Sequence, residues 1–360
     1  MSDNLLELRG ISKGFDGKGI LKELNLDIKR NEFVTLLGPS GCGKTTTLRI
    51  VGGFEKPDMG RVIFNDADIT DLAPEDRHIN TVFQKYALFP HMNVAENIAF
   101  GLKIKKKSNE YIKDKIKYAL KLVDLVGFEE RKPASLSGGQ QQRIAIARAI
   151  VNEPEILLLD EPLGALDLKL RQDMQGELIR LKNELGITFI YVTHDQEEAL
   201  TMSDKVVVMH NGEVQQIGTP KDIYDEPCNA FVADFVGDSN IMKGIMIQDK
   251  LVKILGVNVT CVDEGFGTNT DVDVVIRPED VEIRENGSGL FNGSVKSILY
   301  KGAHYEIKVT ANGYEWLIHN TVAYPVGETV SLYVKPFNIQ IMNPMSEADR
   351  KIVEVPVHES

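Results

Sequence analysis

The chain has 360 residues, of which 42% are hydrophobic, and a net charge of −12. This length and composition predict a folded chain of two or more domains, and the negative charge argues against general nucleic-acid binding, which needs clustered Lys and Arg to meet phosphates. There is no apolar run long enough to cross a bilayer, no secretion signal at Met1–Asn4 and no clustering of the three cysteines, so we expect a cytoplasmic protein without a disulfide framework or metal cluster.

The first informative segment lies between an expected buried strand at Phe33–Leu37 and an expected helix from Thr45 to Val51. Between them the chain fits the pattern G-x-x-x-x-G-K-[ST], with Gly38, Pro39, Ser40, Gly41, Cys42, Gly43, Lys44 and Thr45. Glycines let backbone amides approach phosphate oxygens, and the helix N-terminus, which includes Thr46, favours negative charge.

The same loop carries two side chains with specific chemistry. Lys44 can reach the β- and γ-phosphates of a nucleoside triphosphate, and the Thr45 hydroxyl can ligate Mg²⁺. A dinucleotide site is disfavoured because the third glycine of that pattern is missing. The remaining alternative is a glycine turn that merely precedes a helix.

A lysine-rich segment follows at residues 103–107 and continues into a mixed-charge helical pattern at residues 110–117. This pattern is typical of a solvated helix face, and contact with anionic lipid headgroups is the alternative.

A second anion site is indicated at Leu136–Gln140, before the helical pattern of residues 141–150. Ser137 offers a hydroxyl, Gly138 and Gly139 expose amides, and the helix dipole favours negative charge at this end. Read alone, a Ser-Gly-Gly segment is more often an ordinary N-cap and turn.

The apolar run Ile156–Leu159 ends in two acids and predicts a central parallel strand that delivers carboxylates at its C-terminal edge. Asp160 is placed to hold Mg²⁺ through water. Glu161 is placed to accept a proton from, or to orient, the water that attacks a γ-phosphate. The alternative is a solvated acidic turn.

A further strand is expected at Thr188–Thr193, directly before His194. Asp195 and Glu198 then have the spacing of a capping box. Taken alone, a histidine at a strand end could be structural or merely exposed.

The pattern changes divide the chain into an α/β domain at residues 1–236, with a helix-rich part at about 88–155, and an all-β domain at residues 237–360. Turn signals separate short β-like runs in the second domain: Asn286-Gly287, Ser288-Gly289, Asn292-Gly293, Asn312-Gly313 and Val326-Gly327.

The order of the phosphate loop, the LSGGQ segment and the strand that ends in Asp160-Glu161 resembles the nucleotide-binding domain of ABC transporters. The resemblance implies an ATPase of the P-loop NTPase fold that binds ATP and Mg²⁺. It implies that Phe15 stacks on adenine and that Gln84 contacts Mg²⁺ and the transmembrane partner. It further implies that His194 touches the γ-phosphate and aligns Glu161 with water.

The resemblance also implies a homodimer arranged head to tail, in which Ser137, Gly138, Gly139 and Gln140 of one copy complete the ATP site of the other. Asp167 matches the D-loop, although Gly164 stands where the family usually has serine. Two transmembrane permease subunits and an extracytoplasmic substrate-binding protein are the further partners, with this subunit peripheral at the cytoplasmic face of the membrane and no nucleic acid involved.

The C-terminal part resembles the oligonucleotide-binding-like barrel that importer ATPases carry after this domain. Over the full length the chain is most similar to ATPases of polyamine (spermidine and putrescine) importers, through four phrases: residues 85–92, 237–241, 275–280 and 300–306. The alternatives are importers of sugars, iron or another small solute, and soluble ABC ATPases that act on nucleic acid or ribosomes. The latter usually have paired cassettes or a coiled-coil insert, and here there is one P-loop and no sustained heptad pattern.

Overall fold

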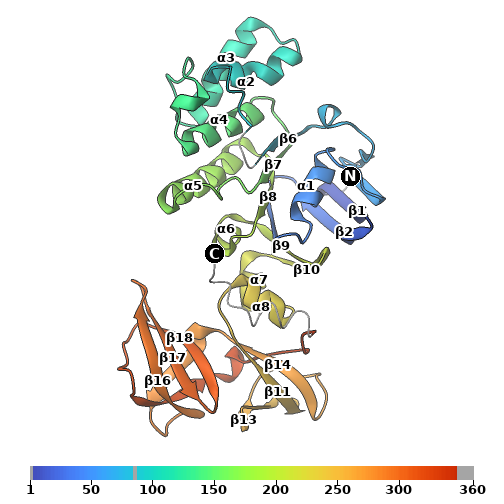
Figure 1. Cartoon of the computed structure of the whole chain (residues 1–360). Helices are drawn as coiled ribbons and strands as arrows, with labels where there is room; N and C mark the ends of the chain where they lie inside the picture. Colours follow the sequence, from blue (N-terminus) through green and yellow to red (C-terminus); the bar gives the residue numbers. More distant parts are fainter. Residues whose placement is uncertain (1–2, 84–86, 347–360) are drawn as a thin grey trace. The chain divides into compact units, whose positions relative to one another are not determined.

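The computed structural model describes residues 3–83 and 87–346, and it contains two compact units, Met1–Lys221 and Asp222–Ser360 (Figure 1). This division assigns α8 (Ala230–Val236) to the second unit. The boundary predicted from the sequence, between residues 236 and 237, places that helix with the first domain and stays a prediction.

The first unit is built around a six-stranded sheet of order β10-β9-β3-β8-β7-β6, in which only the β9–β10 pairing is antiparallel. Its strands are β3 (Phe33–Leu37), β6 (Ile79–Val82), β7 (Ile156–Asp160), β8 (Thr188–Thr193), β9 (Lys205–His210) and β10 (Glu213–Gly218). Strands β3 and β8 are buried at every residue, as expected for parallel strands covered on both faces.

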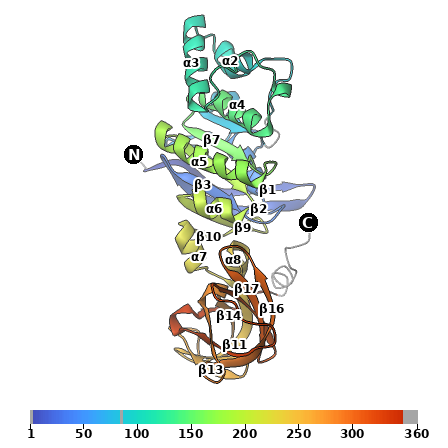
Figure 2. The ribbon, with the colours of Figure 1, turned by 90° about the vertical axis from the view of Figure 1, so that its left-hand side faces the viewer.

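Different elements cover the two faces of this sheet (Figure 2). Helix α5 (Leu168–Leu185) packs Met174 and Leu178 against one face, next to α6 (Gln196–Met202). Helix α1 (Lys44–Val51) and the sheet β2-β1-β4-β5 cover the other. That sheet contains β1 (Asn4–Phe15), β2 (Lys18–Lys29), β4 (Met59–Phe64) and β5 (Ala67–Asp68).

Three helices form a separate layer with its own apolar core: α2 (Val94–Ile104), α3 (Asn109–Leu122) and α4 (Gly138–Ile150). Helix α4 begins three residues earlier than the helical pattern alone indicates, because Ser137 caps it. No helix among the described residues has both the length and the apolar character needed to cross a membrane.

The second unit contains two five-stranded antiparallel sheets, β13-β12-β11-β14-β20 and β15-β19-β16-β17-β18. They share one core around Trp316, which is fully buried. The strands are β11 (Asn240–Gln248), β12 (Leu251–Ile254), β13 (Val257–Thr260), β14 (Thr270–Ile276), β15 (Val281–Glu285), β16 (Phe291–Tyr300), β17 (Tyr305–Ala311), β18 (Tyr314–Asn320), β19 (Thr329–Val334) and β20 (Gln340–Met342). Helix α7 (Pro220–Asp225) spans the division between the units.

One turn signal of the second unit was wrong. Asn292-Gly293 lies inside β16, and a Cβ on Gly293 would be 2.2 Å from the carbonyl oxygen of Thr310 on the neighbouring strand. The glycine therefore marks a close approach of two backbones and not a turn. Asn312-Gly313, in contrast, forms the predicted turn between β17 and β18, with φ values of 50° and 78°.

The segment Arg277–Asp280 connects β14 to β15, and its Arg277 also has a structural role. Its buried guanidinium donates to the carbonyl oxygens of Ala233 (2.7 Å) and Tyr224 (2.9 Å) and to Ser239 Oγ (2.7 Å). It also lies over the ring of Tyr224. Arg277 thus joins the helical start of the second unit to its first sheet.

Candidate functional site

The phosphate-loop pattern lies where the sequence places it, between β3 and α1. Gly43 is the N-cap of α1 in a left-handed conformation, with φ of 106°. A Cβ at Gly38 would lie 2.3 Å from the carbonyl oxygen of Met209 and 2.7 Å from Cys42 Sγ. Glycine at these two positions therefore lets the loop pass close to its neighbours and adopt the left-handed conformation at the helix start.

Lys44 is held by its own loop. Its Nζ donates to the carbonyl oxygens of Gly38 (2.6 Å) and Pro39 (2.9 Å), and the side chain is buried. The ammonium is thus held against the backbone of its own loop.

The two acids at the end of β7 take different positions. Asp160 Oδ1 accepts a hydrogen bond from the Thr45 hydroxyl at 3.0 Å. Burial raises the pKa of Asp160, and the neighbouring Glu161 acts in the same direction, while the Thr45 hydrogen bond opposes the shift. A hydroxyl and a carboxylate side by side are oxygen ligands of the kind that Mg²⁺ prefers.

Glu161 has a strained backbone, with φ of 43°, and its amide donates to the carbonyl oxygen of Val192 on β8. Its Oε1 lies 3.4 Å from Nδ1 of His194, which follows β8. Positive φ is uncommon for a non-glycine residue, and here the hydrogen bond to β8 helps to hold the backbone in that conformation. The pairing of β7 with β8 brings these two side chains together.

A cavity of about 300 Å³ joins these parts. Its lining combines the phosphate loop, the start of α1, the first hairpin and the end of β7: Phe15, Ile20, Ser40, Gly41, Gly43, Lys44, Thr45, Thr46 and Glu161. Phe15 is 43% exposed at the end of β1, with the Lys13 ammonium 5.1 Å from the centre of its ring, so the ring is not part of the apolar core. The sequence did not single out Ile20.

The residues of the LSGGQ segment, Ser137 to Gln140, and Asp167 of the D-loop lie at two other helix starts. Ser137 and Gln140 form a complete capping box on α4, and Asp167 caps α5 by accepting from the amide of Leu170 at 3.0 Å. Ser137 and Asp167 are exposed. Neither they nor the signature glycines line the phosphate-loop cavity formed by the described residues of this chain. Gln84 lies outside the described residues.

A buried network beside His194 was missed by the sequence reasoning. The Asp195 side chain caps α6 by accepting from the amide of Glu198 at 3.1 Å, as predicted. A complete capping box would also have the Glu198 side chain accept from the amide of Asp195, and this half of the prediction was wrong. The amide of Asp195 donates to Thr193 Oγ1, and the Glu198 carboxylate accepts from the hydroxyls of Tyr191 and Thr193 in the interior. The polar residues within the buried strand β8 were the sequence signal from which this network could have been predicted.

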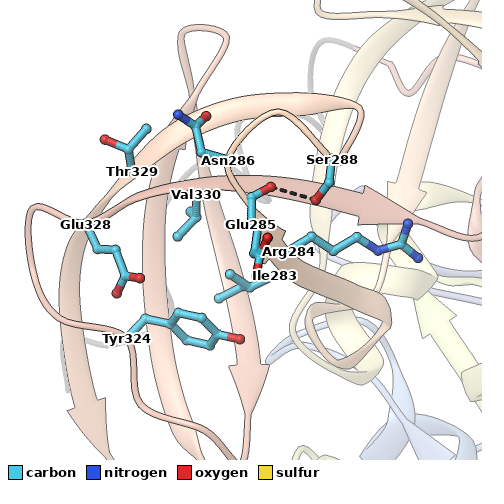
Figure 3. A pocket seen from close by; sticks show the side chains of 9 residues that line it. All are labelled: Ile283, Arg284, Glu285, Asn286, Ser288, Tyr324, Glu328, Thr329 and Val330. Atoms are coloured by element: carbon cyan, nitrogen blue, oxygen red, sulfur yellow. Dashed lines mark hydrogen bonds between the residues drawn. The ribbon is translucent and has the colours of Figure 1, made fainter.

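The second unit has a hollow of its own, of about 570 Å³, at the edge of the β15–β19 pairing (Figure 3). Ile283 and Val330 supply apolar surface, Tyr324 an aromatic ring, and Glu285 and Glu328 carboxylates. The remaining lining residues are Arg284, Asn286, Ser288 and Thr329. None of the candidate ATP-site residues lines this hollow, although Asn286 and Ser288 belong to two of the turn signals.

Family models match both units. The model described as ABC transporter matches residues 21–164, and the model described as TOBE domain matches residues 274–342. Among curated relatives, the spermidine/putrescine import ATP-binding protein PotA of Acetivibrio thermocellus is 63% identical over 95% of this chain and 97% of its own length. The protein of the same name from Clostridium novyi is 60% identical over 96% of this chain and 100% of its own length.

Two solved structures resemble about three fifths of the chain. The structure of cbiO1 from Clostridium perfringens, part of the ABC transporter complex cbiONQ, is 33% identical, covers 62% of this chain and 92% of its own, and has a TM-score of 0.59. The second structure is an ATP-binding cassette in a dimeric post-hydrolysis state, bound to ADP and Pi. It is 36% identical, covers 60% of this chain and 98% of its own, and has a TM-score of 0.54. The predicted P-loop NTPase fold followed by an all-β domain is confirmed.

Proposed function

This chain belongs to the ABC transporter family of ATP-binding proteins, and from that premise we propose that it is the ATP-hydrolysing subunit of an importer for spermidine and putrescine. The observation that carries the polyamine assignment is the 63% identity, over nearly the full length of both chains, to a relative that bears this name. ATP is the nucleotide of this family, and the phosphate loop and Phe15 provide the surfaces that it needs.

For catalysis, we propose that Thr45 and Asp160 hold Mg²⁺, with Gln84 as a further ligand. The 3.0 Å contact between the Thr45 hydroxyl and the Asp160 carboxylate supports this, because both are hard oxygen donors. When bound, the ion neutralises charge on the phosphate oxygens.

Glu161 then orients the attacking water and accepts its proton, and His194, 3.4 Å away, fixes the carboxylate and contacts the γ-phosphate. Lys44 provides a second positive charge from inside the loop, alongside the amides of Gly41 and Gly43.

The site of one chain is completed by a second copy in our proposal. Ser137 and Gly138 are exposed at the start of α4, and this helix end carries the partial positive charge that a phosphate requires. A head-to-tail homodimer brings these residues, with Gly139 and Gln140, to the ATP that the partner's phosphate loop holds. The dimeric state of a solved relative supports this arrangement.

The remaining partners proposed are two transmembrane permease subunits, contacted through the Gln84 region, and an extracytoplasmic substrate-binding protein. The subunit is then peripheral, at the cytoplasmic face of the membrane. ATP binding favours the closed dimer and hydrolysis releases it, so the nucleotide shifts the population of two arrangements of the complex.

The test is uptake of labelled spermidine and, in parallel, labelled maltose by cells whose only copy of the chain carries Lys44→Ala. Loss of spermidine uptake with normal maltose uptake is expected. Lys253→Ala, at an exposed lysine of β12, is the matched control and is expected to leave uptake unchanged.

Loss of maltose uptake alone would assign the chain to a sugar importer. Normal uptake of both solutes would refute the polyamine assignment and favour an importer of iron or another solute.

A further inference from the structure

Glu198 is a carboxylate in the interior of the first unit, on the first turn of α6. It is 3% exposed, and burial raises its pKa. Its Oε2 accepts hydrogen bonds from the hydroxyls of Tyr191, at 2.7 Å, and Thr193, at 2.6 Å. Because a buried carboxylate is costly unless it is hydrogen-bonded, these two contacts fix the side chain in one place.

The two hydroxyls lie on the strand that ends immediately before His194. The Thr193 hydroxyl donates to Glu198 and at the same time accepts from the amide of Asp195, at 2.9 Å. Glu198 therefore determines the orientation of a hydroxyl that bridges the residues on both sides of His194. In this way the backbone of the histidine is held on both sides, while the imidazole itself is 59% exposed and faces Glu161.

Arg171 links this turn to the D-loop. Its Nη1 donates to Asp195 Oδ2 at 2.9 Å, and its Nε lies 4.0 Å from Glu198 Oε1. Its Nη2 donates to the carbonyl oxygen of Leu166, the residue before Asp167, at 3.4 Å. One guanidinium thus contacts the cap of α6, the buried carboxylate and the loop that precedes α5.

We propose that Glu198 and Arg171 are positioning residues for His194, and that they couple its turn to the loop carrying Asp167. This inference rests on the proposed role of His194 in ATP hydrolysis. It explains why Glu198 leaves the capping-box position: the Thr193 hydroxyl satisfies the amide of Asp195, and the carboxylate is then available to hold the turn from inside. A misplacement of catalytic groups by about 1 Å costs on the order of 10²-fold in rate, so the network has a measurable kinetic effect.

The experiment measures steady-state ATP hydrolysis by the purified full-length chain, with kcat and KM for ATP determined separately, and Tm as the control for folding. Glu198→Ala is expected to lower kcat by about 10-fold to 10²-fold with KM within about twofold. Glu198→Gln retains an acceptor oxygen at the same place and is expected to recover most of that loss. Glu177→Ala is the matched control, since Glu177 is a buried carboxylate on α5 that pairs with Arg180.

The deciding measurement combines Glu198→Ala with His194→Ala. If Glu198 acts through the histidine, the double variant is no slower than His194→Ala alone. If Glu198 only stabilises the fold, the fold reduction in kcat caused by Glu198→Ala multiplies the reduction caused by His194→Ala. That result refutes the inference. Thr193→Val provides the same comparison if Glu198→Ala does not fold.

Arg171→Met is expected to lower kcat in the same way. Added to His194→Ala, it is expected to cause no further reduction in kcat. If His194→Ala itself retains normal kcat, the catalytic role proposed for the histidine fails, and this outcome is distinct from failure of the positioning role.

Discussion

Asp234 on α8 gives the second unit a pH-dependent stability that can be measured within the full chain. Burial raises the pKa of this carboxyl from its ordinary value of 3.8 to about 6, with the charge of Asp238 in the same direction and Arg277 opposing it. Because the folded state keeps the proton to higher pH than the unfolded state, the stabilisation is full below pH 3.8. It is lost as the pH rises through 6.

A difference of about two pH units in pKa corresponds to about 3 kcal/mol over the whole range. Between pH 5 and pH 7.5, the folded protein loses about 1 to 1.5 kcal/mol of it. Asp234→Asn mimics the protonated carboxyl and removes this dependence. The difference in unfolding free energy between Asp234→Asn and the unaltered chain is therefore expected to grow by that amount from pH 5 to pH 7.5.

The assay is urea unfolding of the full chain followed by tryptophan fluorescence. Trp316 is the single tryptophan of the sequence and is fully buried in the core of the second unit, so its emission reports on that unit. Asp271→Asn, at an exposed position of β14, is the control and is expected to show no such change. If the difference for Asp234→Asn stays constant across the pH range, the reasoning is refuted.

Three further changes test other parts of the structure. Gly38→Ala places a Cβ 2.3 Å from a backbone oxygen and is expected to weaken ATP binding at least about tenfold. The control is Gly176→Ala, at a position inside α5 where an added Cβ has no atom within 4 Å, and equal affinities of the two variants in a fluorescent-ATP titration would contradict this expectation. Arg277→Met leaves buried carbonyls without donors and is expected to lower the unfolding free energy, read from Trp316 fluorescence, by about 3 to 5 kcal/mol. Arg284 is partly exposed, and Arg284→Met is expected to lower the unfolding free energy by less than about 1 kcal/mol. A similar decrease for both variants would argue against the structural role of Arg277. Glu161→Gln is expected to bind ATP and lose about 10²- to 10⁴-fold in turnover, and near-normal turnover would reject its role as base.

The sequence was sufficient for features that depend on one short segment. The strands at residues 33–37, 156–160 and 188–193 are visible as apolar runs, and the phosphate loop is visible as a pattern, because strand burial and loop geometry restrict residue types locally. The order of these segments along the chain was enough to indicate the family.

Where local signals had two meanings, the sequence was insufficient. Asn292-Gly293 has the composition of a turn, but the nearby backbone of Thr310 decides that it is part of a strand. Nothing in the sequence around Arg277 indicates its structural role, because its acceptors at Tyr224 and Ala233 lie more than forty residues away.

The sequence by itself was enough to propose which residues carry the chemistry of the site: Lys44, Thr45, Asp160, Glu161 and His194. The tertiary structure alone decided how they meet, through the parallel pairing of β7 with β8 that places Glu161 beside His194. It alone turned Glu198 away from its cap and toward Tyr191 and Thr193. The physical reason is that residue patterns report the environment of a single segment, whereas contacts between segments depend on the order of strands in the sheet.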